Sequence, residues 1–172
     1  HNIGFRIIDA VNSHFKLSKQ KPKFKGLLTT GMIGEHKVYA IKPLTFMNNS
    51  GTAIKELIDY FKIDAKDVIV FHDDLDIDFG KIKAKFAGSS AGHHGIDSID
   101  KFIGKDYSRV RIGIGHPKDI KKVNNHVLED FKEDEEDQVK EISENIVKLL
   151  PTLLEKKIDL FSSKVNHNIN GI

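Results

Sequence analysis

Val68-Ile69-Val70-Phe71, followed at once by His72-Asp73-Asp74-Leu75-Asp76, is the stretch that decides the fold. Four consecutive apolar residues bounded by polar ones are typical of a strand that is buried on both faces. Such a strand needs helices to cover it, and helical and extended patterns alternate along the rest of the chain. The sequence therefore predicts an α/β fold, with a single domain whose mixed β-sheet is flanked by helices on both faces.

The segments before this stretch support that class. Apolar residues at helical spacing predict a helix over 3–15 and another over 50–61. Between them, 26–32 and 37–41 have the pattern of two strands joined by a glycine turn. Interleaved helices and strands are what an α/β domain requires.

The segments after it continue the alternation. Residues 81–86 alternate lysine with apolar residues, which predicts a strand with one basic face and one buried face. Residues 110–114 alternate in the same way, and the chain is helical in pattern from there to about residue 161, with Pro151 expected to divide that part into two helices. The polar, Asn-rich residues 162–172 are expected to form a flexible tail, so the domain spans 1–161.

Composition limits the classes of function. The chain has no cysteine, which excludes disulfides, thiolate metal sites and cysteine nucleophiles. It has no apolar run long enough to cross a bilayer and no signal-like N-terminal order, so we expect a cytoplasmic protein without a membrane partner. Residues 129–144 carry a charge of −7, so the remainder carries +9. A segregated basic body favours a polyanionic partner, although a solvated acidic helix beside ordinary surface lysines gives the same charges.

Three polar segments follow strand-like runs, at 45–51, 72–76 and 88–95. Loops at strand ends are where an α/β scaffold displays catalytic groups, so their shared placement favours one common site. Taken singly, each segment also fits a structural role as a helix cap, a turn or a bend.

The same segments belong to five blocks that resemble, in order, the signature blocks of bacterial-type peptidyl-tRNA hydrolases. The blocks are His1-Asn2-Ile3-Gly4-Phe5, Lys42-Pro43-Leu44-Thr45-Phe46-Met47-Asn48-Asn49-Ser50-Gly51, His72-Asp73-Asp74-Leu75-Asp76, Ala91-Gly92-His93-His94-Gly95 and Arg109-Val110-Arg111-Ile112-Gly113-Ile114-Gly115-His116-Pro117. The resemblance is close from His1 to about Phe131. It implies hydrolysis of the ester that joins a peptide to the 3′ ribose of tRNA, which recycles tRNA from stalled translation without a metal or an organic cofactor.

The resemblance also implies roles for individual residues. His1 matches the family's general base and Asp73 the carboxylate that holds its imidazole. Histidine suits this task because its unperturbed pKa is near neutrality, and a carboxylate on the second ring nitrogen fixes the tautomer. Water would be the nucleophile, and the positive end of a helix dipole beside His1 would keep the ring unprotonated.

Further positions match the family's substrate contacts, namely Phe46, Asn48 and His93. His94 is a departure, because the family usually carries an asparagine there. Candidate contacts for tRNA phosphates are the cations Lys81, Lys83, Lys85, Lys101, Lys105, Arg109, Lys118, Lys121 and Lys122. No metal site and no obligate protein partner are inferred, and the chain is expected to be a monomer that acts on peptidyl-tRNA.

The other departure is at the start of the chain, where the family has a strand and a glycine-rich loop before the histidine. The sequence is therefore expected to be an N-terminally truncated form. One alternative is a catalytically impaired, hydrolase-like RNA-binding protein. Another is metal-dependent hydrolysis, because imidazoles and carboxylates are good metal ligands; its candidate ligands are His72, Asp73, Asp76 and His93.

Overall fold

The computed structural model describes residues 2–116 and 131–170. Helices and strands alternate along the chain, which confirms the predicted α/β class. Its contacts cluster into two compact units. Unit 1 comprises His1–Ala10, Phe71–Ala84 and Val110–Ile172, and unit 2 comprises Val11–Val70 and Lys85–Arg109.

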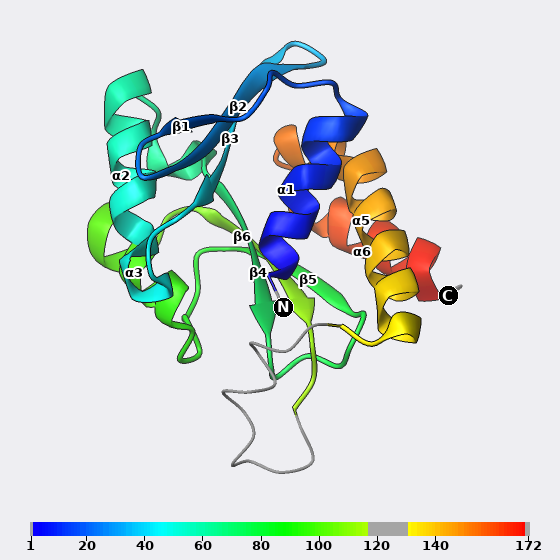
Figure 1. The fold of residues 1–172 in the computed structure, drawn as a ribbon. Coiled ribbons are helices and arrows are strands. Elements are labelled where there is room, and N and C mark those ends of the chain that lie inside the picture. Colours follow the sequence, from blue (N-terminus) through cyan, green and yellow to red (C-terminus); the bar gives the residue numbers. More distant parts are fainter. Residues whose placement is uncertain (1, 117–130, 171–172) are drawn as a thin grey trace. The chain divides into compact units, whose positions relative to one another are not determined.

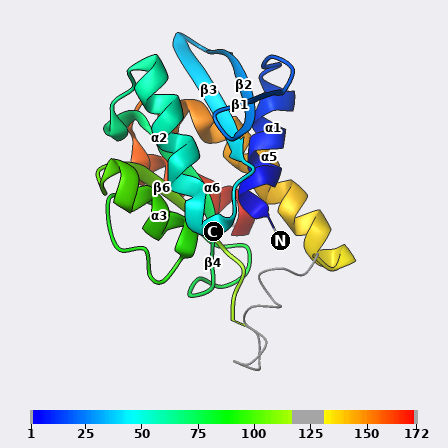
Figure 2. The same cartoon turned by 60° about the vertical axis from the view of Figure 1, so that its left-hand side comes forward.

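Unit 2 contains an antiparallel sheet of three strands in the order β1-β2-β3. Strands β2 (Gly26–Ile33) and β3 (His36–Pro43) match the two strands that were predicted around a glycine turn. Strand β1 (Lys21–Lys23) was not predicted, because its sequence is Lys-Pro-Lys and all three residues are exposed. It forms an edge of the sheet (Figure 2).

Two helices complete unit 2 and lie side by side in both views (Figures 1 and 2). These are α2 (Ser50–Phe61) and α3 (His94–Ile103). They approach closely at Gly51, where a Cβ atom would lie 2.3 Å from the carbonyl oxygen of Ser98. The buried core of the unit consists of Leu28, Ile54, Leu57, Ile58, Ile96, Ile99 and Tyr107.

The second sheet has the order β4-β6-β5, with strands Ile69–Asp74, Ser108–Gly113 and Ile82–Phe86 respectively. Backbone bonds at the two ends of β4, from Ser108 N to Val68 O and from Ile114 N to Asp74 O, make β4 and β6 parallel. The bonds of β6 with β5 run the other way, because Gly113 pairs with Lys81 while Tyr107 pairs with Ala87. The sheet is therefore mixed, as predicted.

The helices of unit 1 include α5 (Glu133–Leu154) and α6 (Ile158–Asn170), which pack on each other (Figure 1). The prediction that Pro151 divides the last helical part was wrong, because α5 continues past it to Leu154. The break falls at Lys156, whose φ of 63° is left-handed and ends the helix. Two helices are present, but the proline does not separate them.

The predicted flexible tail is also wrong for residues 162–170, which belong to α6. Phe161 and Val165 are fully buried in unit 1. The polar residues bind the backbone of β5: Ser162 Oγ accepts the amide of Ala84 at 3.1 Å, and the amide group of Asn166 bonds both the N–H and the C=O of Ile82. These side chains satisfy backbone groups that an edge strand would leave unpaired.

No helix among the described residues is both long enough and apolar enough to span a membrane.

Candidate active site

In unit 1, the end of strand β4 carries the acidic segment, and the strand separates its first two carboxylates. Because β4 continues to Asp74, the side chains of Asp73 and Asp74 leave opposite faces. Asp74 is buried, with a relative exposure of 8%, whereas Asp73 is half-buried. The two neighbouring acids are therefore in different environments.

Asp74 is committed to a structural role. Its Oδ2 atom accepts a hydrogen bond of 2.7 Å from Nε of Arg111 on β6, and its Oδ1 atom accepts the backbone N–H of Asp76 at 2.8 Å. The side chain of Asp76 is exposed and pairs with Nε2 of His116 at 2.7 Å. Among the described residues, no group of three or more His, Asp or Glu side chains could hold a metal ion.

Helix α1 (Ile3–His14) begins against this strand within unit 1. Asn2 caps it, because its Oδ1 atom accepts the backbone N–H of Phe5 at 3.0 Å. A Cβ atom at Gly4 would lie only 2.6 Å from the carbonyl oxygen of Phe71. The first turn of α1 is thus held directly against β4, two residues before Asp73. His1 itself lies outside the described residues.

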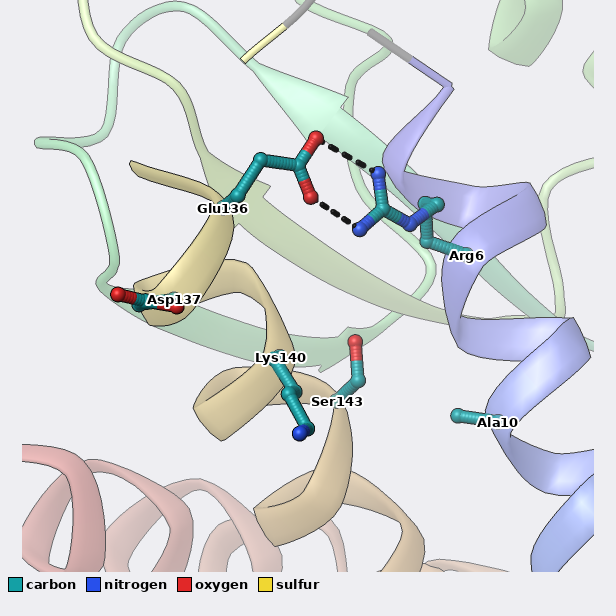
Figure 3. Close-up of a pocket in the computed structure, with 6 residues that line it drawn as sticks. All are labelled: Arg6, Ala10, Glu136, Asp137, Lys140 and Ser143. Atoms are coloured by element: carbon teal, nitrogen blue, oxygen red, sulfur yellow. Dashed lines mark hydrogen bonds and ion pairs between the residues drawn. The ribbon is translucent and has the colours of Figure 1, made fainter. Parts of the chain in front are cut away.

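An ion pair ties the first turn of α1 to α5. The guanidinium of Arg6 donates two hydrogen bonds to the carboxylate of Glu136, at 3.1 and 2.5 Å (Figure 3). These bonds lower the pKa of Glu136 and raise that of Arg6. The pair borders an open pocket of about 310 Å³, which is also lined by Ala10, Asp137, Lys140 and Ser143. None of the predicted site residues lines this pocket.

In unit 2, the loop between β3 and α2 displays the predicted substrate contacts. Phe46 is 84% exposed, and Asn48 is exposed on the short 3-10 helix η1 (Met47–Asn49). The loop is fixed to the start of α3, because Cβ at Gly95 would lie 2.7 Å from the sulfur of Met47. Met47 was not predicted to matter, but its close approach to Gly95 and the hydrogen bond of 2.8 Å that Ser50 Oγ donates to its carbonyl oxygen show that it fixes the loop.

His93 and His94 have different roles at the start of α3. His93 is the N-cap, and its Nδ1 atom accepts the backbone N–H groups of Gly95 and Ile96 at 3.1 and 3.2 Å. Nδ1 therefore carries no proton, and the ring's proton is on Nε2. His94 is the first helical residue and is exposed. Unit 2 thus brings together the loop of Phe46 and Asn48 with both histidines.

The predicted phosphate contacts separate into exposed and buried groups. The exposed ones are Lys81, Lys83, Lys85, Lys101 and Lys105, of which Lys81 pairs with Asp78 at 3.6 Å. Lys118, Lys121 and Lys122 lie outside the described residues. Phosphate contact by Arg109 is contradicted, because this residue is only 2% exposed and its guanidinium is already paired with Asp100.

Arg109 is the centre of a buried polar network in unit 2. It donates to Asp100 Oδ1 and to the carbonyl of Gly88, both at 2.9 Å, and its guanidinium lies 4.5 Å from the centroid of the Tyr107 ring. The hydroxyl of Tyr107 also donates to Asp100 Oδ1, at 2.7 Å. Because Gly88 belongs to the loop that leads to His93, the network fixes that loop.

Burial, together with the hydrogen bond to Asp100, raises the pKa of Tyr107 above its ordinary value. A raised pKa in the folded state stabilises the protein fully below the unfolded value of about 10, and this stability is lost as the pH rises above it. We expect the free energy of unfolding to fall above pH 10 by up to about 1.4 kcal/mol per pH unit more in the wild type than in Tyr107→Phe. Denaturant unfolding between pH 9 and 11 measures this difference. Tyr60→Phe, at a 62% exposed position, is the control and should leave the slope unchanged.

Comparisons with known proteins support one family. The model of the family described as peptidyl-tRNA hydrolase matches residues 1–171. The peptidyl-tRNA hydrolase of Pelagibacter ubique is 71% identical over 97% of this chain and 90% of its own length. That of Ehrlichia ruminantium strain Welgevonden is 44% identical, over 96% of this chain and 84% of its own.

A solved structure agrees with these relatives. The crystal structure of peptidyl-tRNA hydrolase from Acinetobacter baumannii superposes with a TM-score of 0.89 at 29% sequence identity, over 96% of this chain and 85% of that one. The prediction that a strand and a loop are missing before His1 is not tested by these alignments and stays a prediction. The family model, the sequence relatives and the shared fold together establish that this chain belongs to the peptidyl-tRNA hydrolase family.

Proposed function

We propose that the chain hydrolyses the ester bond between the peptide and the 3′ ribose of peptidyl-tRNA, with His1 as the general base and Asp73 as its orienting carboxylate. The observation that carries this assignment is the placement of Asp73. It is half-buried on the face of β4 opposite the Asp74–Arg111 ion pair, and the first turn of α1 is packed on the same strand at Phe71.

The start of α1 suits a neutral base. His1 directly precedes Asn2, the residue that caps the helix, so the positive end of the helix dipole is close in sequence. That field disfavours the imidazolium and favours the form of the ring that accepts a proton from water. After water attacks the ester carbonyl, the proton held by the imidazole is available for the departing 3′ oxygen of the ribose.

Residues of unit 2 supply groups for the acceptor end of tRNA. An exposed ring such as that of Phe46 offers a stacking surface to a nucleobase. The exposed amide of Asn48 offers both a donor and an acceptor. His93 caps α3 through Nδ1, so it contributes mainly by fixing the loop. His94 is exposed, which leaves room for an imidazole where the family usually has an asparagine.

The remaining expectations are part of the same proposal. The enzyme acts as a cytoplasmic monomer on peptidyl-tRNA without a metal or organic cofactor. Exposed lysines on β5 and after α3 supply phosphate contacts that carry no sequence information. The competing proposal is an RNA-binding protein without turnover, and hydrolysis of peptidyl-tRNA by the purified protein separates the two.

We expect Asp73→Asn to lower turnover of peptidyl-tRNA by at least tenfold without changing the melting temperature, because an amide still fits the site but can present its N–H to the imidazole and favour the wrong tautomer. Asp74→Asn should do the reverse. It weakens a hydrogen-bonded ion pair at a buried carboxylate, so it should lower the free energy of unfolding by about 1 to 3 kcal/mol. Turnover per folded molecule should change much less. Steady-state kinetics and thermal melts of both variants measure this contrast.

Asp76→Asn is the matched control, because its carboxylate is exposed and pairs only with His116 among the described residues. It should change neither quantity much. Equal losses of turnover in all three variants would instead indicate a shared metal site or a structural turn, and would remove Asp73 as the specific partner of the base.

A further inference from the structure

The edge strand of unit 2 lies in the most basic part of the chain. No Asp or Glu occurs between Asp9 and Glu35, whereas five lysines fall within ten residues: Lys16, Lys19, Lys21, Lys23 and Lys25. All five are exposed. This segment, 16–25, is called the lysine edge below. It contains none of the lysines assigned above to tRNA.

The geometry of the lysine edge places its charges in a row. Ser18 and Thr30 exchange two hydrogen bonds, of 2.8 and 2.9 Å, so the chain runs beside β2 from Ser18 to Lys23. Side chains two residues apart in a strand share a face, at a spacing of about 6.8 Å. Lys21 and Lys23 therefore project together, and Lys19 lies farther along the same edge.

Most of these charges have no carboxylate partner in the part of the chain that the structure describes. Lys25 pairs with Glu56 at 3.1 Å, but within 2–116 and 131–170 no ion pair joins Lys16, Lys19, Lys21 or Lys23 to an acid. Lys23 is held instead by aromatic rings. Its ammonium lies 4.5 Å from the ring centroid of Tyr60 and 5.1 Å from that of Phe24.

These two rings already position the ammonium of Lys23, so this side chain loses less conformational freedom when it binds a phosphate. Tyr60, on α2, is 62% exposed, and an exposed ring beside lysines is a surface on which a nucleobase can stack. A row of cations with no carboxylate partner among the described residues, beside an exposed ring, fits RNA, because its backbone repeats a phosphate at every nucleotide next to a base that can stack on a ring.

The lysine edge also leads toward the proposed acceptor-end loop within unit 2. The backbone N–H of Leu44 donates to the carbonyl of Lys25 at 2.9 Å, and Phe46 follows two residues later. In the sheet, Lys23 pairs with Gly26, which pairs with Pro43, so the end of β1 is two strand spacings, about 10 Å, from the end of β3.

We propose that the lysine edge is a second contact for the RNA of the substrate, which binds the sugar–phosphate backbone of tRNA upstream of the 3′ end held at Phe46 and Asn48. This inference rests on the proposed function. The alternative role of edge lysines, which is to prevent pairing of the strand with other chains, requires charge or polarity but no RNA.

The test is the affinity of the full-length chain for tRNA as a function of salt, in the triple variant K19Q/K21Q/K23Q. In a plot of the logarithm of the binding constant against the logarithm of the salt concentration, each lost phosphate contact should make the slope shallower by about 0.7 to 0.9. For three lost contacts we expect a slope shallower by about 2 to 3, and an affinity that is lower on the order of 100-fold at 0.1 M salt. The control K55Q/K62Q/K66Q removes the same charge from exposed lysines of α2 and the segment after it, two of which already pair with acids. It should have a much smaller effect.

Tyr60 provides an independent variant. Tyr60→Leu removes the ring and should weaken tRNA binding about fivefold or more, whereas Tyr60→Phe keeps the ring and should bind as the wild type does.

Equal losses of tRNA affinity in the two triple variants would mean that only net charge matters. Unchanged binding in K19Q/K21Q/K23Q would leave protection of the strand edge as the sole role of these lysines. Either result overturns the inference.

A minimal ester separates this inference from the proposed function. An N-acylated amino acid on the 3′ ribose of adenosine carries no phosphate for the lysine edge to bind, so K19Q/K21Q/K23Q should hydrolyse it at the wild-type rate and lose kcat/KM only on full-length peptidyl-tRNA. Failure of the wild type to cleave either ester would refute the proposed function, while the comparison of tRNA affinities would still decide the role of the lysine edge.

Discussion

Replacing His1 with alanine is expected to lower turnover of peptidyl-tRNA by about 100- to 10,000-fold, the contribution of a positioned general base. Binding of tRNA should change little, because the imidazole acts on the water and not on the phosphates. The loss should therefore be in kcat, with KM nearly constant. Single-turnover kinetics together with tRNA affinity measure the two effects separately.

The pH profile sharpens this test. In the wild type, kcat/KM should decline as the pH falls through the range in which histidine gains a proton, because only the neutral ring is a base. The residual activity of His1→Ala should lack that decline. His14→Ala is the matched control, since this histidine at the end of α1 is exposed and packs edge-on against Phe15. Near-normal hydrolysis by His1→Ala would end the proposed mechanism.

The periodicity of apolar residues predicted the helices and strands that have an apolar face of their own to bury. Helices α1 and α2 and strands β2 to β6 all occur near the predicted residues. Helix α6 was mistaken for a tail because its polar residues have partners far away in sequence. The bonds from Ser162 and Asn166 to β5 span 78 and 84 residues. No local pattern contains that information.

Part of the candidate site was likewise predicted from the sequence, and part was not. The family resemblance gave a role to Asp73 and none to Asp74, and the structure then supplied Arg111 as the reason that Asp74 is buried. Residue type alone gave a wrong prediction for Arg109, which was expected to contact phosphate but is buried. An arginine on a strand next to a basic loop has the composition of a phosphate contact, but burial depends on which groups the fold brings to it.

Breaking the Arg109 network is the second change with a large expected effect. Arg109→Leu should destabilise the protein by about 3 to 5 kcal/mol, because it leaves the carboxylate of Asp100 uncompensated at an exposure of only 11%. That is a large part of the 5 to 15 kcal/mol that ordinarily keeps a domain folded. Denaturant unfolding of the variant measures the loss. Lys101→Leu, at an exposed position on α3, is the control and should be nearly neutral.

The double variant Arg109→Leu/Asp100→Asn distinguishes a buried charge from a simple loss of packing. An asparagine removes the unpaired charge while its oxygen can still accept the hydroxyl of Tyr107, so the double variant should be more stable than Arg109→Leu alone. Because Arg109 also holds the carbonyl of Gly88, the double variant should still lose turnover through the loop that leads to His93. A stable Arg109→Leu protein with a shallower salt dependence of tRNA binding would reverse the assignment and restore Arg109 as a phosphate contact.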